Sequence, residues 1–353
     1  MFYSTIKQDV DVSILNIKKV VRIELLASWK HYFLLFLLAF IIFSTTNWCI
    51  VSSEIEMQNQ GSLNRFPQRI VVFPLFAEEM LLEMIGPERI VYVGHEYFEN
   101  GEGYSPMMEL AKNIKGRSWN MSDDEDIFAL NPDLIIIYDY DLPYFERMFP
   151  MLHYTNIPIL CITQPTTIDE IQNSLITLGG IVGAPKKAMQ MVDYLKNNLT
   201  YITEITSFVP DEMRIHVFHY VYYTNDYRSE EEEPFTCWYR QNSFAMTARC
   251  AGVFAEGPDI EDPVYGEPED WLIEANPDII TFDYAYYDTD GSIFDLTGIY
   301  HDTIINDLLN NRRLSNIKAI KNHAIFPVRI FESQLIVQSA IDLAQLAYPD
   351  LFP

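Results

Sequence analysis

Short apolar runs rich in Val and Ile alternate along the chain with segments whose apolar residues recur every three or four positions. A run of the first kind is typical of a strand that is buried on both faces of a parallel sheet. A segment of the second kind is typical of an amphipathic helix. The alternation therefore predicts an α/β fold with strands in five stretches of the chain, namely 69–73, 89–93, 157–162, 214–221 and 324–328.

One of these patterns occurs twice. Residues 131–140 read NPDLIIIYDY, and residues 276–284 read NPDIITFDY. In both copies a short segment that begins with acids precedes the Asn-Pro-Asp turn, which is expected to end a helix and start a buried strand. The repeat predicts two similar lobes.

Three predicted helices organise these lobes. Residues 77–85 form an amphipathic segment with Gly86 as its C-cap, and Thr167 with Glu170 matches a capping box. From residue 185 to about 205 the helical pattern is uninterrupted, which indicates one helix long enough to cross two adjacent lobes. We expect an N-terminal lobe over 67–184, a linking helix over 185–207 and a C-terminal lobe over 208–353.

The segment 32–51 contains no charged residue and is long enough to span a bilayer, which takes about 20 residues. Lys and Arg precede it and acids follow it, so the positive-inside bias predicts that residues 1–31 are cytoplasmic. The segment is either a retained anchor or a cleaved signal. Residues 52–66 then form a linker, and the rest of the chain is extracytoplasmic, anchored to the cell membrane or secreted.

The composition argues against one class of function and permits disulfide bonds. The chain has 50 acidic and 24 basic residues and a formal net charge of −26, which argues against a groove for nucleic acid. The four cysteines of an exported chain permit disulfides. Cys237 and Cys250 are the plausible pair, because Cys161 lies in an apolar run where a buried thiol is expected.

Motifs of common enzymes are missing from the sequence. It contains no G-x-x-x-x-G-K-[ST], no G-x-S-x-G and no H-E-x-x-H. His216 and His219 resemble a metal pair, but residues three apart on a strand point to opposite faces and cannot chelate one ion. We therefore predict no catalytic residues, no metal site and no enzyme.

Four segments, in order, carry a resemblance to a known family. They are RIVVFPLFAEEMLLEMIGPERIVYVG, EDIFALNPDLIII, IPILCITQPTTIDEIQNSLITLGGIVG and EDWLIEANPDIITF. Together they resemble the helical-backbone metal-chelate solute-binding proteins of ABC importers, which include binders of vitamin B12, ferric siderophores and haem. The resemblance covers residues 67–345. It implies two Rossmann-like lobes with mainly parallel sheets joined by one long backbone helix, the chelatase-like fold of class III periplasmic binding proteins.

The loops that follow the strands are rich in aromatic residues. Ligands of open parallel sheets bind beyond the carboxyl ends of the strands, and flat aromatic walls suit a porphyrin, a corrin or an aryl siderophore. Trp119, six residues before Glu125, also matches by spacing a pocket Trp of the B12-binding members. The predicted ligand-binding residues are Phe76, His95, Tyr97, Trp119, Tyr138, Tyr140, His219, Tyr220, Tyr222, Arg228, Tyr284, Tyr286 and Arg329.

The resemblance implies a receptor that captures an iron chelate, a siderophore or haem, between its lobes and delivers it to an ABC permease and its ATPase. Basic residues are few in the predicted loops, which favours neutral or cationic chelates, or haem with one or two Arg on its propionates. Cobalamin is the alternative ligand, and a metal-chelate enzyme on a chelatase- or nitrogenase-like scaffold is the alternative of another class. We expect a monomer without a cofactor.

In the family, one carboxylate on each lobe docks onto Arg residues of the transporter. By motif position these acids are Glu125 and Asp270, each six residues before the Asn of its repeat, with Glu269 beside the second. Acids at these positions also stabilise the helix dipole, which gives them a structural explanation as well.

Overall fold

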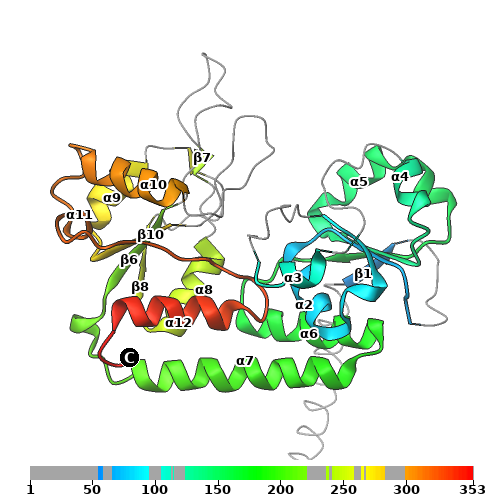
Figure 1. Ribbon diagram of the computed structural model, residues 1–353, viewed down its shortest axis with the longest axis horizontal. Coiled ribbons are helices and arrows are strands. Elements are labelled where there is room, and N and C mark those ends of the chain that lie inside the picture. Colours follow the sequence, from blue (N-terminus) through cyan, green and yellow to red (C-terminus); the bar gives the residue numbers. More distant parts are fainter. Residues whose placement is uncertain are drawn as a thin grey trace, which may run out of the picture. The chain divides into compact units, whose positions relative to one another are not determined.

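A computed structural model describes residues 55–58, 66–94, 105–112, 114, 124–220, 236–237, 241–257, 264–265, 268–282 and 299–352. Residues 57–353 form one compact unit, distinct from residues 1–56, and this unit is described here by itself (Figure 1). The predicted cytoplasmic segment 1–31 and span 32–51 lie outside the described residues. Among the residues that are described, none belongs to a helix with both the length and the apolar character needed to cross a membrane.

The first lobe contains a sheet of strand order β1-β5-β4-β2-β3, and the pairs β5-β4, β4-β2 and β2-β3 are parallel. Strands β2, β3 and β5 begin and end within two residues of the predicted boundaries, whereas β1 lies in the segment predicted as a linker. The strands are β1 (Ile55–Gln58), β2 (Ile70–Val72), β3 (Ile90–Val93), β4 (Leu134–Tyr138) and β5 (Ile159–Ile162). The helices are α2 (Leu75–Ile85), η1 (Pro87–Arg89), α3 (Met108–Ala111), α4 (Asp124–Ala129), η2 (Asp139–Asp141), α5 (Leu142–Met148), η3 (Pro150–Tyr154) and α6 (Ile168–Val182).

The second lobe repeats this architecture with the parallel strand order β11-β10-β6-β8. A separate antiparallel pair joins β7 (Thr236–Cys237) to β9 (Val264–Tyr265). The sheet strands are β6 (His216–Tyr220), β8 (Phe254–Glu256), β10 (Ile279–Phe282) and β11 (Ile325–Pro327). The helices are η4 (Asp211–Met213), α8 (Gln241–Ala251), α9 (Pro268–Ala275), α10 (Ile299–Asn310), α11 (Lys318–Lys321) and α12 (Ile336–Ala347).

Each lobe has its own apolar core. In the first lobe, Val71, Ile135 and Cys161 from three strands pack with Phe145 and Phe149. In the second, residues of β6, β10 and β11 pack with apolar residues of α9, α10 and α11. Every residue of β4 and β10 is buried, which explains why β4 is an unbroken apolar run and β10 contains a single polar residue, Thr281.

The long helix α7 (Pro185–Thr206) joins the lobes and confirms the predicted linking helix. Its 22 residues correspond to about 33 Å at 1.5 Å per residue. It packs on α6 at one lobe and on α8 and α12 at the other, as Figure 1 shows. Before it, α6 starts with the predicted capping box of Thr167 and Glu170 and ends at Gly183, whose φ of 76° is readily accessible to glycine.

The first Asn-Pro-Asp turn forms a corner between α4 and β4. Asn131 has a left-handed φ of 48°, which Asn tolerates better than most residues. The Asp133 carboxylate accepts hydrogen bonds from the backbone N–H of Gln68 at 2.8 Å and of Arg69 at 2.7 Å. The Arg69 guanidinium in turn donates to the carbonyl of Leu130 at 2.9 Å, at the end of the preceding helix. The corner thus holds the start of β2 beside β4.

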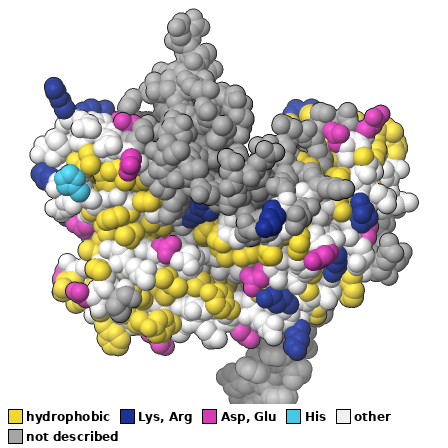
Figure 2. All heavy atoms as spheres, in the orientation of Figure 1, with side chains coloured by type: hydrophobic (Ala, Val, Ile, Leu, Met, Phe, Trp, Pro, Cys, Tyr) yellow, Lys and Arg dark blue, Asp and Glu magenta, His cyan; other side chains and the backbone are white. Residues whose placement is uncertain are grey.

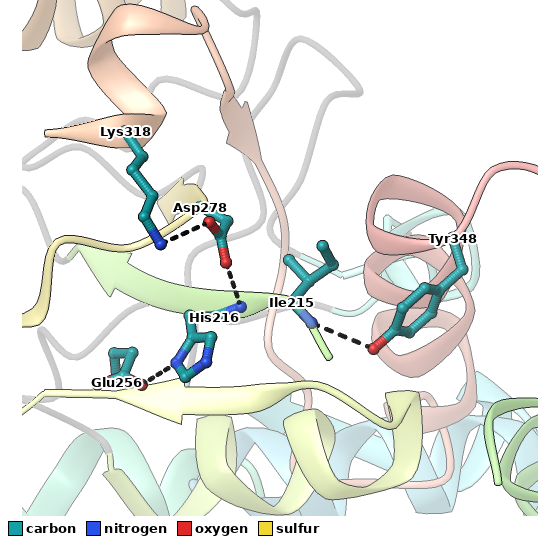
Figure 3. Close-up of polar contacts among 6 residues, drawn as sticks. All are labelled: Ile215, His216, Glu256, Asp278, Lys318 and Tyr348. Carbon is teal, nitrogen blue, oxygen red and sulfur yellow. Dashed lines mark hydrogen bonds and ion pairs between the residues drawn. The ribbon is translucent and has the colours of Figure 1, made fainter. Parts of the chain in front are cut away.

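The second turn forms the equivalent corner between α9 and β10. Asn276 has a φ of 43°, and its side-chain oxygen accepts from the backbone N–H of Lys318 at 3.0 Å. Asp278 accepts from the backbone N–H of His216 at 3.1 Å and pairs with Lys318 Nζ at 3.2 Å. Figure 3 shows Asp278 between these two partners. The predicted role of the repeat, to end a helix and start a buried strand, is confirmed in both lobes.

Two expectations need correction. Cys250 is a free thiol, so the disulfide with Cys237 is not formed. Cys250 lies on α8, whereas Cys237 belongs to β7 and pairs with β9, a different part of the lobe. The helix α2, expected to bury one face, is buried along nearly its whole length, including Glu78 and Glu79, because other elements pack on more than one side of it.

Candidate functional site

Three residues predicted to bind ligand meet at the carboxyl end of β4. Tyr138 ends this strand, Tyr140 follows in η2, and Phe76 lies in the first turn of α2. The rings of Tyr138 and Tyr140 stack with centroids 4.8 Å apart and an interplanar angle of 16°, and Phe76 lies 6.0 Å from Tyr138. Phe76 and Tyr138 are buried, while Tyr140 is 60% exposed. Tyr140 therefore presents an accessible aromatic surface on a buried aromatic base.

The loop that carries Tyr140 is held by Asp139. One carboxylate oxygen of Asp139 accepts from the Tyr140 backbone N–H at 2.8 Å, and the other accepts from the Thr163 hydroxyl at 2.6 Å. Thr163 follows β5, so the loop is fastened to the neighbouring strand. Burial, and then the nearby charge of Asp139, raise the pKa of Asp141. Asp139 is thus a positioning residue for the aromatic group, a role that its place in a turn did not reveal.

The predicted ligand-binding residues of the second lobe that the structure describes are less exposed than Tyr140. His219 is buried, stacks on Phe244 with centroids 5.0 Å apart, and its Nδ1 lies 3.0 Å from the Thr281 hydroxyl. Tyr220 is half-buried against the core of the second lobe, and Arg329 is half-buried after β11. His219 therefore serves as a packed and hydrogen-bonded residue of the sheet in this structure, not as an accessible ligand at the rim.

His216 and His219 have separate surroundings, as their spacing predicts. The His216 ring nitrogen Nδ1 lies 2.5 Å from Glu256 Oε1 of the adjacent strand β8, as Figure 3 shows. Within the described ranges, no group of three or more His, Cys, Asp or Glu side chains is arranged to hold a metal ion. The two histidines thus have structural partners of their own.

The acids predicted to dock onto a transporter lie at the starts of two equivalent helices. Glu125 is exposed near the start of α4, and Glu269 and Asp270 lie in the first turn of α9. Asp270 forms an ion pair with Arg313 Nη2 at 2.5 Å, and Glu269 Oε1 accepts weakly from Asn311 Nδ2 at 3.4 Å. Both acids of the second lobe thus have partners from the segment after α10.

Seven of the predicted ligand-binding residues lie outside the described residues. They are His95, Tyr97, Trp119, Tyr222, Arg228, Tyr284 and Tyr286.

A surface pocket of about 300 Å³ lies elsewhere, between the start of α6, α7 and the end of α8. Its lining includes Asp169, Thr203, Arg249 and Cys250, and it contains none of the predicted ligand-binding residues. Burial raises the pKa of the Cys250 thiol to about 11, so this thiol is unreactive at neutral pH.

Sequence reasoning missed a group of buried acids. Glu78 and Glu79 of α2 and Glu332, before α12, are at most 7% exposed. Glu78 accepts from the Gly94 backbone N–H at 2.7 Å, and Glu332 accepts from the Ser243 hydroxyl at 2.6 Å. The only local signal is a pair of Glu within the apolar run LFAEEMLLEM, which does not reveal what packs on it.

The described residues that Figure 2 shows do not form one continuous acidic surface, although the composition is strongly acidic. Acidic and basic side chains are interspersed there, and hydrophobic side chains gather over α12 and the neighbouring part of α7.

Comparison with protein-family models finds no match, and comparison with curated proteins finds none either. Solved structures do match. A periplasmic binding protein from Veillonella parvula has a TM-score of 0.61 and 15% identity over 81% of this chain and 86% of that one. The TroA-like periplasmic binding protein FepB from the same organism has a TM-score of 0.59 and 19% identity, over 82% and 88% of the two chains.

A third match is the molybdate periplasmic binding protein MolA of a Haemophilus influenzae ABC transporter. Its TM-score is 0.58 and its identity 14%, over 81% of this chain and 88% of that one. All three are named as periplasmic binding proteins. At such low identity the shared property is the fold, which is that of class III periplasmic binding proteins: two lobes with parallel sheets joined by one long helix. This confirms the fold that the resemblance implied.

Proposed function

We propose that the chain is an extracytoplasmic solute-binding receptor of an ABC importer, which binds its solute and passes it to a permease without catalysing a reaction. The observation that carries the proposal is the stacked pair Tyr138–Tyr140 at the carboxyl end of a central strand, in a fold shared with periplasmic binding proteins. Parallel α/β sheets bind ligands at this edge.

The proposed ligand is an iron chelate, a siderophore or haem, with cobalamin as the alternative. An exposed aromatic ring on a buried aromatic base suits a flat conjugated ligand, because stacking buries a large area at little cost in rotamer entropy. Among the solved neighbours, one is named as a possible iron-binding protein, one was solved with Ni(II) and one with molybdate, so this fold accommodates different solutes.

The test mixes the full chain with haem, a ferric hydroxamate or cyanocobalamin and measures visible absorption after desalting. We expect one chromophore to be retained. Tyr140→Ala should weaken its binding by about 1–2 kcal/mol, the usual scale for an aromatic contact. Tyr154→Ala is the matched control, because Tyr154 is 84% exposed in η3 and is not a predicted ligand residue.

Two outcomes would count against the proposal. If Tyr140→Ala and Tyr154→Ala bind the retained chromophore with equal affinity, the Tyr138–Tyr140 pair is not part of the binding site. Chemical conversion of a retained chromophore by the protein alone would favour the enzyme alternative over a receptor.

A further inference from the structure

The two lobes are joined by polar contacts between α2 and the segment 332–335, which we call the lobe junction. Ser333 Oγ donates to Glu79 Oε2 at 2.5 Å. Gln334 Nε2 donates to the backbone carbonyl of Glu79 at 3.3 Å and to Glu83 Oε2 at 3.1 Å. These partners are more than 250 positions apart in the sequence, and Ser333 leads directly into α12, which packs on α7 and α8.

The residues at the centre of the lobe junction are buried. Glu79 is 1% exposed, Ser333 is fully buried and Gln334 is 2% exposed. A carboxylate in such a place must be paired or neutral, because removing its charge from water is costly.

The charged groups around Glu79 are mainly acidic. Glu78 of α2 and Glu332 of the crossing segment both repel a negative charge on Glu79. The buried residues of α6, which packs on α2, are Ile171, Leu175, Leu178, Gly179 and Val182, none of them ionisable. Lys187 of α7 pairs with Glu83, one turn further along α2, at 3.2 Å.

These surroundings favour the neutral form of Glu79. Burial, reinforced by the charges of Glu78 and Glu332, raises the pKa of Glu79 from 4.5 to about 7. Hydrogen bonds from the hydroxyls of Ser105 and Ser333 act in the opposite direction, but they do not outweigh the loss of hydration.

We propose that Glu79 forms a proton-controlled latch between the lobes: its burial favours the closed junction while the carboxyl is neutral, and ionisation of Glu79 favours opening of the junction to water, although the Ser333 hydroxyl also bonds to the charged form. The latch is a property of the lobe junction and holds whether or not the chain binds a solute. Its test can therefore fail without affecting the proposed receptor function, and the reverse is also true.

The direction of the pH effect follows from linkage. A carboxyl whose pKa is raised in the closed junction binds its proton more tightly there than when water reaches it. The closed junction is then favoured at low pH, and this advantage is lost as the pH rises from 4.5 through 7. With these two values the opening equilibrium should increase roughly 30-fold between pH 5.5 and pH 8.

The experiment is hydrogen–deuterium exchange of the full chain at these two pH values, expressed as protection factors so that the intrinsic effect of pH is removed. The amides to follow are Phe331, which donates to Ser339 Oγ, and Leu335, which donates to Ser333 Oγ. Wild type should lose protection roughly 30-fold on going to pH 8. Glu79→Gln, which mimics the neutral carboxyl, should change less than about threefold. The control Glu88→Gln removes an exposed carboxyl of the same lobe and should behave as wild type.

An equal loss of protection in wild type and Glu79→Gln would overturn the latch, and so would a wild type without pH dependence. If Glu79→Gln does not fold, carbon NMR titration of the glutamate carboxyls in wild type decides. A carboxyl that titrates near pH 7 and is shifted by Ser333→Ala supports the latch, and the absence of any carboxyl titrating above pH 5.5 refutes it.

Discussion

The two Asn-Pro-Asp corners each connect the end of a helix to the start of a buried strand, but their Asp side chains have different hydrogen-bonding partners. In the first lobe, the backbone N–H of Asp133 donates to the Arg69 carbonyl at 2.9 Å, and in the second, that of Asp278 donates to the His216 carbonyl at 2.8 Å. The carboxylate of Asp133 holds two backbone N–H groups, whereas that of Asp278 holds one and an ammonium group. The repeat therefore preserves the backbone connection between neighbouring strands and leaves the side-chain partners free to differ.

Removing the carboxylate of Asp133 or of Asp278 is the strongest test of the difference between the two corners. Asp133→Ala should lower the free energy of unfolding by about 1.5–3 kcal/mol, because it leaves two backbone donors without their charged acceptor. Asp278→Ala should lower the free energy of unfolding by about 1 kcal/mol, because it leaves one backbone donor without its acceptor and removes a partly exposed ion pair. Urea denaturation of the full chain measures both, with Asp193→Ala on the exposed face of α7 as control. Equal costs for the two corners would show that the difference in partners has no energetic consequence.

The second test concerns the left-handed asparagines. The backbone contribution to the loss of stability should be about 1 kcal/mol in both Asn131→Ala and Asn276→Ala, because alanine tolerates a positive φ less well than asparagine. Asn276→Ala should cost about 0.5–1.5 kcal/mol more, since it also removes the acceptor for the Lys318 N–H. Glycine at each position isolates the second effect, because glycine relieves the backbone strain. If Asn276→Gly were no less stable than Asn131→Gly, the side-chain bond to Lys318 would have no net effect.

The smallest expected effect concerns the acids six residues before each asparagine. Arg313→Ala breaks the pair with Asp270, whose side chains are 52% and 63% exposed, so stability should change by less than about 0.5 kcal/mol. The midpoint of thermal unfolding of Arg313→Ala should match that of Glu125→Ala. A drop of several degrees with Arg313→Ala would mean that the pair is structural, which would weaken the docking role that the sequence predicts for Asp270.

Much of the fold could be predicted because the signals are local. The capping box of Thr167 and Glu170, the turn residues Asn131 and Asn276 and the continuous helix α7 all depend on residues a few positions apart. The candidate site was predicted less completely. Phe76, Tyr138 and Tyr140 do meet, but His219 is packed against Phe244, because strand periodicity tells which face a residue occupies and not what covers that face.

The sequence by itself determined the repeat in two lobes, the linking helix and strands β2 to β6, β10 and β11, since hydrophobic periodicity and turn chemistry act within short stretches of chain. It did not reveal the short strands β1, β7, β8 and β9. The tertiary structure decided which partners Asp133 and Asp278 take, and it buried Glu79 against Ser333, 254 positions away. Burial and a shifted pKa depend on groups brought together from distant parts of the chain. No local pattern around Glu79 contains that information, and only the packing of α2 against the segment 332–335 supplies it.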